Sequence, residues 1–77
     1  MVVAYIFVIT KSGTRADVSK ESFTKLKGVK DVAEVYGEYD IVVKVQVDNM
    51  GDLQKFILDL RDIGGVEKTT TMISVKD

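Results

Sequence analysis

The 77-residue sequence contains no cysteine and no histidine, and these two absences remove most of the common reactive groups. Without cysteine there is no disulfide bond to stabilise a small domain. Without either residue the commonest zinc ligands, the usual general base and the strongest side-chain nucleophile are missing. We therefore expect no metal and no cofactor, and we interpret the chain as a protein that is not an enzyme.

An excess of charge of one sign is lacking as well. The formal net charge is −1, and acidic residues are interspersed with basic ones along the chain. Nucleic-acid-binding proteins usually carry a basic patch, so this balance argues against direct contact with nucleic acid. Tyr5 and Phe7 have the chemistry to stack on bases from a sheet surface, but a buried contact with another protein explains them better.

Long apolar runs are also absent. No stretch approaches the ~20 residues that a membrane-spanning helix needs, and the sequence after Met1 has no basic segment or cleavage site typical of a signal peptide. We expect a soluble, cytoplasmic protein with no membrane partner. Residues 1–77 form one domain that buries only ~60–65% of its unfolded surface. Self-association is a common way to stabilise a domain of this size.

Four strands are predicted. Residues 2–10 are apolar at almost every position, which is typical of a strand that is covered on both faces. Residues 29–36, 40–47 and 66–75 predict the other three. Positions 41, 43, 45 and 47 are all apolar and alternate with a mixed set, so this side of the third strand should face helices.

Two helices separate these strands. Thr14 can cap the first, which Gly28 ends; Asp48 or Asn49 can cap the second, which ends at Gly64. The order strand, helix, strand, strand, helix, strand predicts an α+β, ferredoxin-like fold. In it, one four-stranded antiparallel sheet carries both helices on one face, and the first and third strands are central.

The first strand is apolar on the face that this fold leaves without helices. Alternate positions point to opposite faces, and neither set is polar: Ala4, Ile6 and Val8 form one set, and Val3, Tyr5, Phe7 and Ile9 form the other. An exposed apolar sheet usually marks an interface. We predict that the second face packs against another copy of the chain.

The segment Gly37, Glu38, Tyr39 and Asp40 is the first candidate site. In the simpler interpretation it is a hairpin turn, with glycine at a positive φ and Asp40 bonded to a nearby backbone amide. The alternative is a site for a small dipolar molecule. A glycine turn exposes N–H groups to a carboxylate, and the carboxylates of Glu38 or Asp40 accept from an ammonium group.

Two further sites were considered. Thr69 and Thr71 offer hydroxyl groups near the end of the chain, although threonine is also common in edge strands simply because it favours extended backbone. Residues 11–15 precede a helix and have the form of an anion site, but almost any capped helix shows as much. The turn and the two threonines therefore remain the stronger candidates.

Several of these motifs together resemble the effector domain of the Lrp/AsnC feast/famine regulators. The first is the sequence Gly37-x-Tyr39-Asp40 followed by residues 41–45, and the second is Gly65-Val66 with Thr69, Thr71 and Ile73. The similarity extends over essentially all 77 residues. Because Met1 leads directly into the first strand, the chain resembles a stand-alone RAM module, without the helix-turn-helix that usually precedes this domain.

The resemblance implies partners and a site. It implies dimers formed by facing sheets, rings of eight or ten subunits, an amino acid effector bound between dimers, and contact with a full-length Lrp/AsnC regulator. It also implies a ligand-binding set, completed from a neighbouring subunit's last strand: Gly37, Glu38, Tyr39, Asp40, Thr69 and Thr71. Glu38 is a departure, because many relatives carry Asp or Asn at this position.

The leading hypothesis is an amino-acid-binding oligomeric module that modulates transcription regulators of amino-acid metabolism through assembly. One alternative is an oligomerisation scaffold that binds no ligand. Another is a small cofactor-free enzyme of the dimeric α+β barrel type, which would need a deep internal cavity holding Tyr36, Asp40 or another ionisable group.

Overall fold

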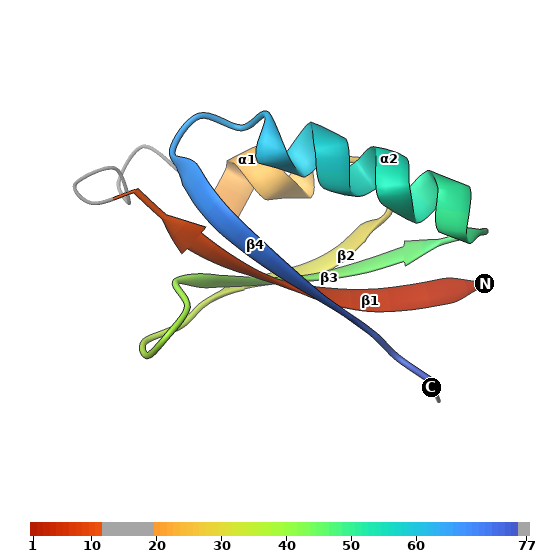
Figure 1. Ribbon diagram of the computed structural model, residues 1–77, viewed down its shortest axis with the longest axis horizontal. Coiled ribbons are helices and arrows are strands. Elements are labelled where there is room, and N and C mark those ends of the chain that lie inside the picture. The colour runs from red at the N-terminus through yellow and green to blue at the C-terminus, as the bar shows by residue number, and fades with distance from the viewer. Residues whose placement is uncertain (12–19, 76–77) are drawn as a thin grey trace.

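The computed structural model describes residues 1–11 and 20–75 (Figure 1). The elements, in order, are β1 (Val2–Thr10), α1 (Lys20–Thr24), β2 (Val29–Glu34), β3 (Ile41–Val47), α2 (Met50–Arg61) and β4 (Val66–Ile73). The predicted order and the ferredoxin-like fold class are confirmed. The predicted cap of the first helix, Thr14, lies outside the described residues.

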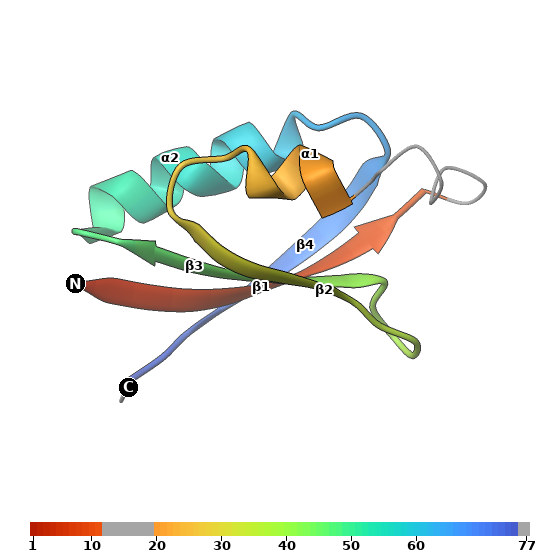
Figure 2. The ribbon, with the colours of Figure 1, turned by 180° about the vertical axis from the view of Figure 1, so that it is seen from behind.

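The four strands form one antiparallel sheet in the order β2-β3-β1-β4. The first and third strands are therefore central, as predicted. Both helices lie on the same face of this sheet, which is clear in the two opposite views of Figures 1 and 2. Within the described part of the chain no helix lies over the other face, which we call the open face.

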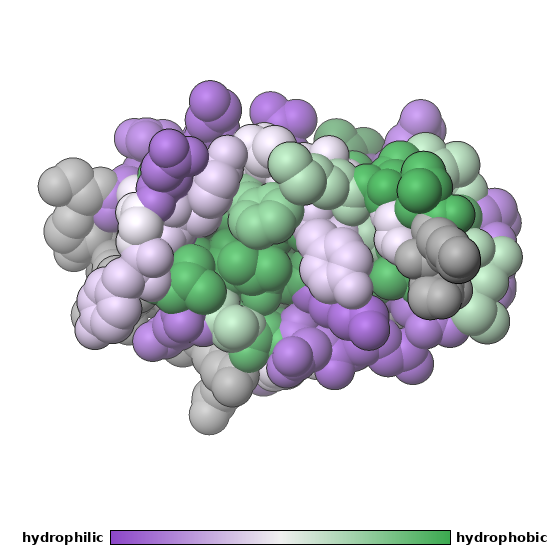
Figure 3. Space-filling view, turned by 90° about the horizontal axis from the view of Figure 1, so that it is seen from below, coloured by the Kyte–Doolittle hydropathy of each residue, from purple (hydrophilic) through white to green (hydrophobic). Residues whose placement is uncertain are grey.

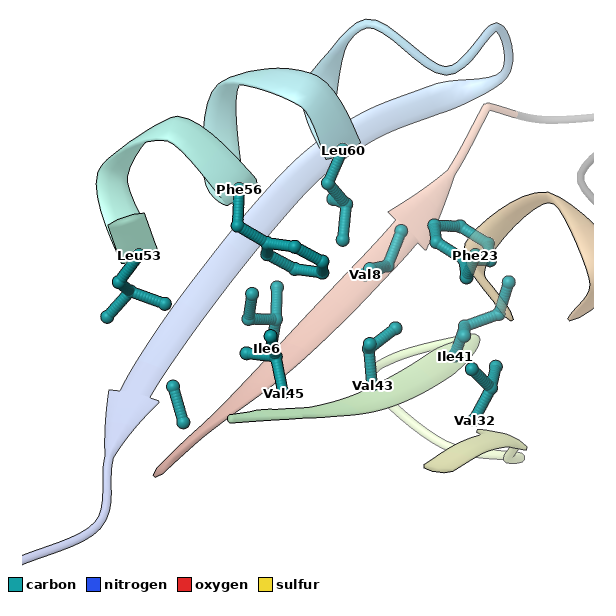
Figure 4. Packing of buried hydrophobic residues seen from close by; sticks show 11 residues of the cluster. Ile6, Val8, Phe23, Val32, Ile41, Val43, Val45, Leu53, Phe56 and Leu60 are labelled. Atoms are coloured by element: carbon teal, nitrogen blue, oxygen red, sulfur yellow. The ribbon is translucent and has the colours of Figure 1, made fainter. Parts of the chain in front are cut away.

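The hydrophobic core lies between the helices and the sheet (Figure 4). Phe23 extends from α1, and Phe56 and Leu60 extend from α2, toward the strands. Their strand partners include Ala4, Ile6, Val8, Val32, Ile41, Val43 and Val45, all buried. Burying one such large side chain stabilises the fold by roughly 1.5–3 kcal/mol, so this single layer supplies most of the domain's apolar stabilisation.

Helix α2 follows the predicted pattern closely. Asn49, one of the two proposed caps, accepts a hydrogen bond from the Asp52 amide at 2.8 Å. Leu53, Phe56 and Leu60 are buried at the spacing i, i+3 and i+7. The apolar positions of the sequence therefore determine which side of α2 faces the sheet.

Strand ends differ slightly from the predicted ranges. β2 stops at Glu34 rather than 36, and β4 stops at Ile73 rather than 75. The Val35 amide instead bonds the Asp40 carbonyl oxygen at 2.9 Å, which closes the hairpin. The Ser74 amide still bonds the Val3 carbonyl oxygen at 2.8 Å, so backbone contact with β1 continues past the end of β4.

Gly28 should be the glycine that the fold tolerates least when replaced. Its φ is +98°, and an added Cβ would lie 3.0 Å from the Gln46 carbonyl oxygen. Because strain and a close contact act together, Gly28→Ala should lower the free energy of unfolding by ~2–4 kcal/mol, measured by urea denaturation at fixed protein concentration. Gly64→Ala is the matched control, since its Cβ would meet nothing within 4 Å. Equal stability of the two variants would contradict this assignment.

Candidate functional site

The hairpin between β2 and β3 places the predicted turn residues at one end of the sheet. Gly37 has a φ of +133°, a conformation that favours glycine. A Cβ at this position would meet nothing within 4 Å, so backbone conformation rather than crowding requires glycine here. Gly37 and Glu38 are both exposed, which leaves the tip of the hairpin open to contact with another molecule.

The Asp40 carboxylate has a role within the fold. Its Oδ2 accepts the Thr10 backbone amide at 2.8 Å and the Thr10 hydroxyl at 3.0 Å. The Asp40 amide in turn donates to the Val8 carbonyl oxygen at 2.9 Å. Asp40 therefore joins the hairpin to the end of β1, where the pairing with β4 shifts register between Ile9 and Thr10.

The Tyr39 side chain also makes a contact within the chain. Its ring centroid lies 5.1 Å from that of Phe7, with the two planes at 46°. Because Phe7 belongs to the open face, Tyr39 extends the apolar surface of that face past the edge of the strands. Tyr36, two residues before Glu38, is 96% exposed.

The two predicted threonines lie on the helix side of the sheet. Thr69 is the register partner of Val8, and Thr71 is the partner of Ile6. Antiparallel partners share a face, and Val8 and Ile6 are fully buried beneath the helices. Thr70 pairs with Phe7 on the open face instead. The six predicted ligand-binding residues therefore do not all meet within one chain. Completion of the site by a neighbouring subunit stays a prediction.

The open face is an apolar surface, and the hairpin between β2 and β3 lies at its border. Tyr5 is 38% exposed and Met72, its register partner, is 58% exposed. Phe7 and Val42 pair in the next row and are half-buried. Figure 3 shows hydrophobic residues gathered over the middle of this face and hydrophilic residues around much of it. A contiguous apolar surface with a polar border is typical of a protein–protein contact.

A pocket of about 350 Å³ lies at the other end of β3. Phe56, Leu26 and Val47 supply its apolar part, and charged groups of both signs surround it; the full lining is Leu26, Lys27, Gly28, Gln46, Val47, Asp48, Asp52, Lys55, Phe56 and Asp59. β3 has seven residues, so its two ends are ~20 Å apart. The pocket and the hairpin are therefore separate features.

The described part of the chain offers neither a metal site nor a membrane-spanning helix. Within residues 1–11 and 20–75, no group of three or more acidic side chains has the arrangement needed to hold a metal ion. In the same residues no helix is both long enough and apolar enough to cross a membrane.

The structure is thus a ferredoxin-like domain with an open apolar face and a glycine hairpin beside it. Residues 3–77 match the family described as Lrp/AsnC ligand binding domain. The chain belongs to this family, as the resemblance in its sequence indicated.

Curated relatives include longer proteins of two kinds. The HTH-type transcriptional regulator FL11 of Pyrococcus abyssi is 37% identical over 73 residues, which are 95% of this chain and 48% of the regulator. A homocitrate synthase of Sulfurisphaera tokodaii is 33% identical over 73 residues, which are 95% of this chain and 16% of the enzyme. The chain thus spans about half the length of the regulator and a small part of the enzyme.

Solved structures agree with this assignment. The structure of FFRP-DM1 superposes with a TM-score of 0.87 at 38% identity, covering 97% of this chain and 100% of that one. The transcriptional regulator NMB0573 of Neisseria meningitidis, solved as a complex with L-Met, has a TM-score of 0.87 at 22% identity. That superposition covers 99% of this chain and 51% of the regulator, and it shows a shared fold.

Two features of the structure have no clear signal in the sequence. The bond between Asp40 and Thr10 joins residues thirty positions apart, and no local spacing reveals it, although an Asp directly after a turn suggested a backbone acceptor. The pocket beside Phe56 forms where three segments of the chain meet. In the sequence, its charged residues look like those on any exposed side of a helix.

Asp40→Ala should destabilise the domain whether or not a ligand is present. It removes a charged acceptor from two Thr10 groups, so we expect a loss of ~2–3 kcal/mol in the free energy of unfolding. Asp40→Asn keeps an acceptor oxygen and should lose less. Glu38→Ala, on the exposed tip, is the control and should stay within ~0.5 kcal/mol of the parent. Chemical denaturation measures all three; a fully stable Asp40→Ala would show that the bond to Thr10 contributes nothing.

Proposed function

We propose that this domain is an amino-acid-binding regulatory module that acts through assembly with other copies and with full-length Lrp/AsnC regulators. The observation that carries the proposal is the apolar open face bordered by an exposed glycine hairpin, in a chain of the Lrp/AsnC ligand-binding family. Such a surface suits a binding site that is complete only when a second subunit packs against it.

The chemistry of the hairpin suits the two charged ends of an amino acid. The exposed turn at Gly37 presents backbone toward solvent, and backbone N–H groups in such a turn can bind a carboxylate. Glu38 is exposed and offers a carboxylate to an ammonium group. The Asp40 Oδ2 already accepts two hydrogen bonds from Thr10. Asp40 would therefore orient the hairpin, and Glu38 would be the main acceptor for the ligand's ammonium group.

Assembly supplies what a single chain lacks. Thr69 and Thr71 are half-buried on the helix side of β4, an edge strand, while Tyr39 lies on the open face. A neighbouring subunit could bring its own Thr69 and Thr71 to this hairpin, in a dimer or in rings of eight or ten. The ligand would then alter assembly by binding one assembly state more tightly than the other.

The relatives support this class of ligand without identifying it. NMB0573, which shares the fold, was solved with L-methionine, and FL11 is a transcriptional regulator. The same kind of domain matches part of homocitrate synthase, which suggests a regulatory part that can accompany different activities. The effector of this chain is proposed only as an amino acid.

The two alternatives receive less support. The enzyme hypothesis required a deep internal cavity holding Tyr36, Asp40 or another ionisable group. Tyr36 is 96% exposed, and the pocket of about 350 Å³ is lined by neither Tyr36 nor Asp40. The ionisable residues that do line this pocket are all exposed: Lys27, Asp48, Asp52, Lys55 and Asp59. The scaffold hypothesis differs from the proposed function only in lacking a ligand, so a binding measurement separates them.

Light scattering with a panel of the twenty amino acids tests the proposed function. We expect a mass well above the 8.5 kDa of one chain, and a change of mass or of dissociation on dilution with one or a few amino acids. Calorimetry of the same mixtures measures the affinity. An assembled protein that binds none of the twenty would leave the scaffold hypothesis, and a monomer that binds none would contradict both halves of the proposal.

Paired variants test the location of the site. Glu38→Gln should weaken binding of the effector by ~10-fold, because it removes one charge from an ammonium contact, whereas Glu34→Gln, exposed on β2, should not. Thr71→Val should weaken binding, and Thr24→Val, exposed at the end of α1 and away from both the hairpin and the open face, should leave it unchanged. Calorimetry gives the affinities and amide NMR shifts give the location. Shifts confined to the pocket around Phe56 would move the site to the other end of β3.

A further inference from the structure

Lys44 places a positive charge in the middle of the open face. It lies on β3, a central strand, and its register partners are Tyr5 on β1 and Asp31 on β2. Side chains of antiparallel partners share a face, so all three lie on the open face. The Lys44 Nζ is 5.9 Å from the centroid of the Tyr5 ring, within the range of a cation–π contact.

The surroundings of Lys44 are already partly dehydrated in one chain. Lys44 is half-buried, as is Val42, two residues before it on the same face. The stem of a lysine can cover apolar surface while its ammonium group stays in water. A second protein layer over this face would remove that water, and a buried ammonium group then needs an opposite charge.

Asp31 is placed to supply that charge. It is exposed and is the register partner of Lys44 across β2 and β3, next to a shift of register between Val29 and Asp31. In the single chain the Asp31 Oδ1 accepts the Val32 amide at 2.9 Å, and the Lys44 Nζ lies over Tyr5, on the other side of β3. Glu34, the other acidic residue toward the end of β2, pairs with Ile41 and so belongs to the helix side. The register therefore selects Asp31 as the carboxylate of β2 that can reach Lys44 on the open face.

We infer that Lys44, with Asp31 as its counter-charge once the open face is covered, determines which surface can pack against that face. This inference rests on the proposed self-association through that face. A symmetric dimer uses the same patch twice, so it brings two Lys44 ammonium groups into one interface. Two Asp31 carboxylates cancel that charge. A partner with unpaired basic residues at the facing positions would be rejected, while a second copy of this chain is accepted.

A double-mutant cycle on the dimer dissociation constant tests this role. Asp31→Asn should weaken dimers by ~10-fold or more, because it leaves Lys44 buried without a counter-charge. Lys44→Met, which keeps the unbranched stem, should leave affinity equal or higher. The double variant should then match Lys44→Met within ~3-fold, since nothing remains for Asp31 to neutralise. Sedimentation at fixed ionic strength measures all four proteins.

Two controls and one charge exchange complete the test. Glu34→Gln and Lys55→Met remove the same charges at exposed positions away from the open face, and they should leave dimerisation unchanged. Lys44→Glu places a second carboxylate opposite Asp31 and should abolish self-association. Adding Asp31→Lys to that variant should restore it. Circular dichroism of each variant confirms that the monomer is folded.

The outcomes separate this inference from the proposed function. If the parent protein dimerises and the four proteins of the cycle agree within ~2-fold, Lys44 lies at a solvated border of the interface and its proposed role is wrong. If the parent is monomeric at every concentration, self-association through the open face fails and the role of Lys44 fails with it. Amino-acid binding measured on the same parent protein reports separately on the ligand.

Discussion

The sheet has two faces, and the helices of the described residues, 1–11 and 20–75, cover only one of them. This constraint governs the rest of the structure, because β1 is apolar on both sides. Ile6 and Val8 are fully buried under α1 and α2, while Tyr5, in the same strand, remains 38% exposed. Burying apolar surface is the main favourable term in folding and in association. The domain is therefore folded as a unit and still has apolar surface that association can remove from water.

The hairpin at the border of that surface divides its residues between two tasks. Tyr39 packs on Phe7 and Asp40 binds Thr10, so these two residues orient the turn. Gly37 and Glu38 are left exposed. A rigid base with an exposed tip suits recognition, because a ligand then meets groups that are already ordered and less conformational entropy is lost on binding. Under the proposed function, removal of Tyr39 or Asp40 would change ligand binding indirectly, through the position of the tip.

The sequence predicts most of the fold because the strongest signals are local and periodic. Alternation at residues 41–47 gave the buried side of β3, and the spacing of Leu53, Phe56 and Leu60 gave the buried side of α2. The candidate site is predicted less completely. Alternation indicates that Thr69 and Thr70 point to opposite faces, but their pairing with Val8 and Phe7 decides which face each takes. The bond from Asp40 to Thr10 depends on two strands meeting, and no periodic pattern encodes it.

The pairing of β1 with β4 has a consequence for how this domain can be joined to others. Ala4 is the partner of Ile73, so the two ends of the folded unit lie at the same end of the sheet, remote from the hairpin (Figure 1). A covalent neighbour attached at either end would leave the hairpin unobstructed, and the whole unit could be inserted into a loop of a larger protein with little distortion. This geometry suits a domain that can be joined to different neighbours, and it agrees with the presence of similar segments in the transcriptional regulator FL11 and in a homocitrate synthase.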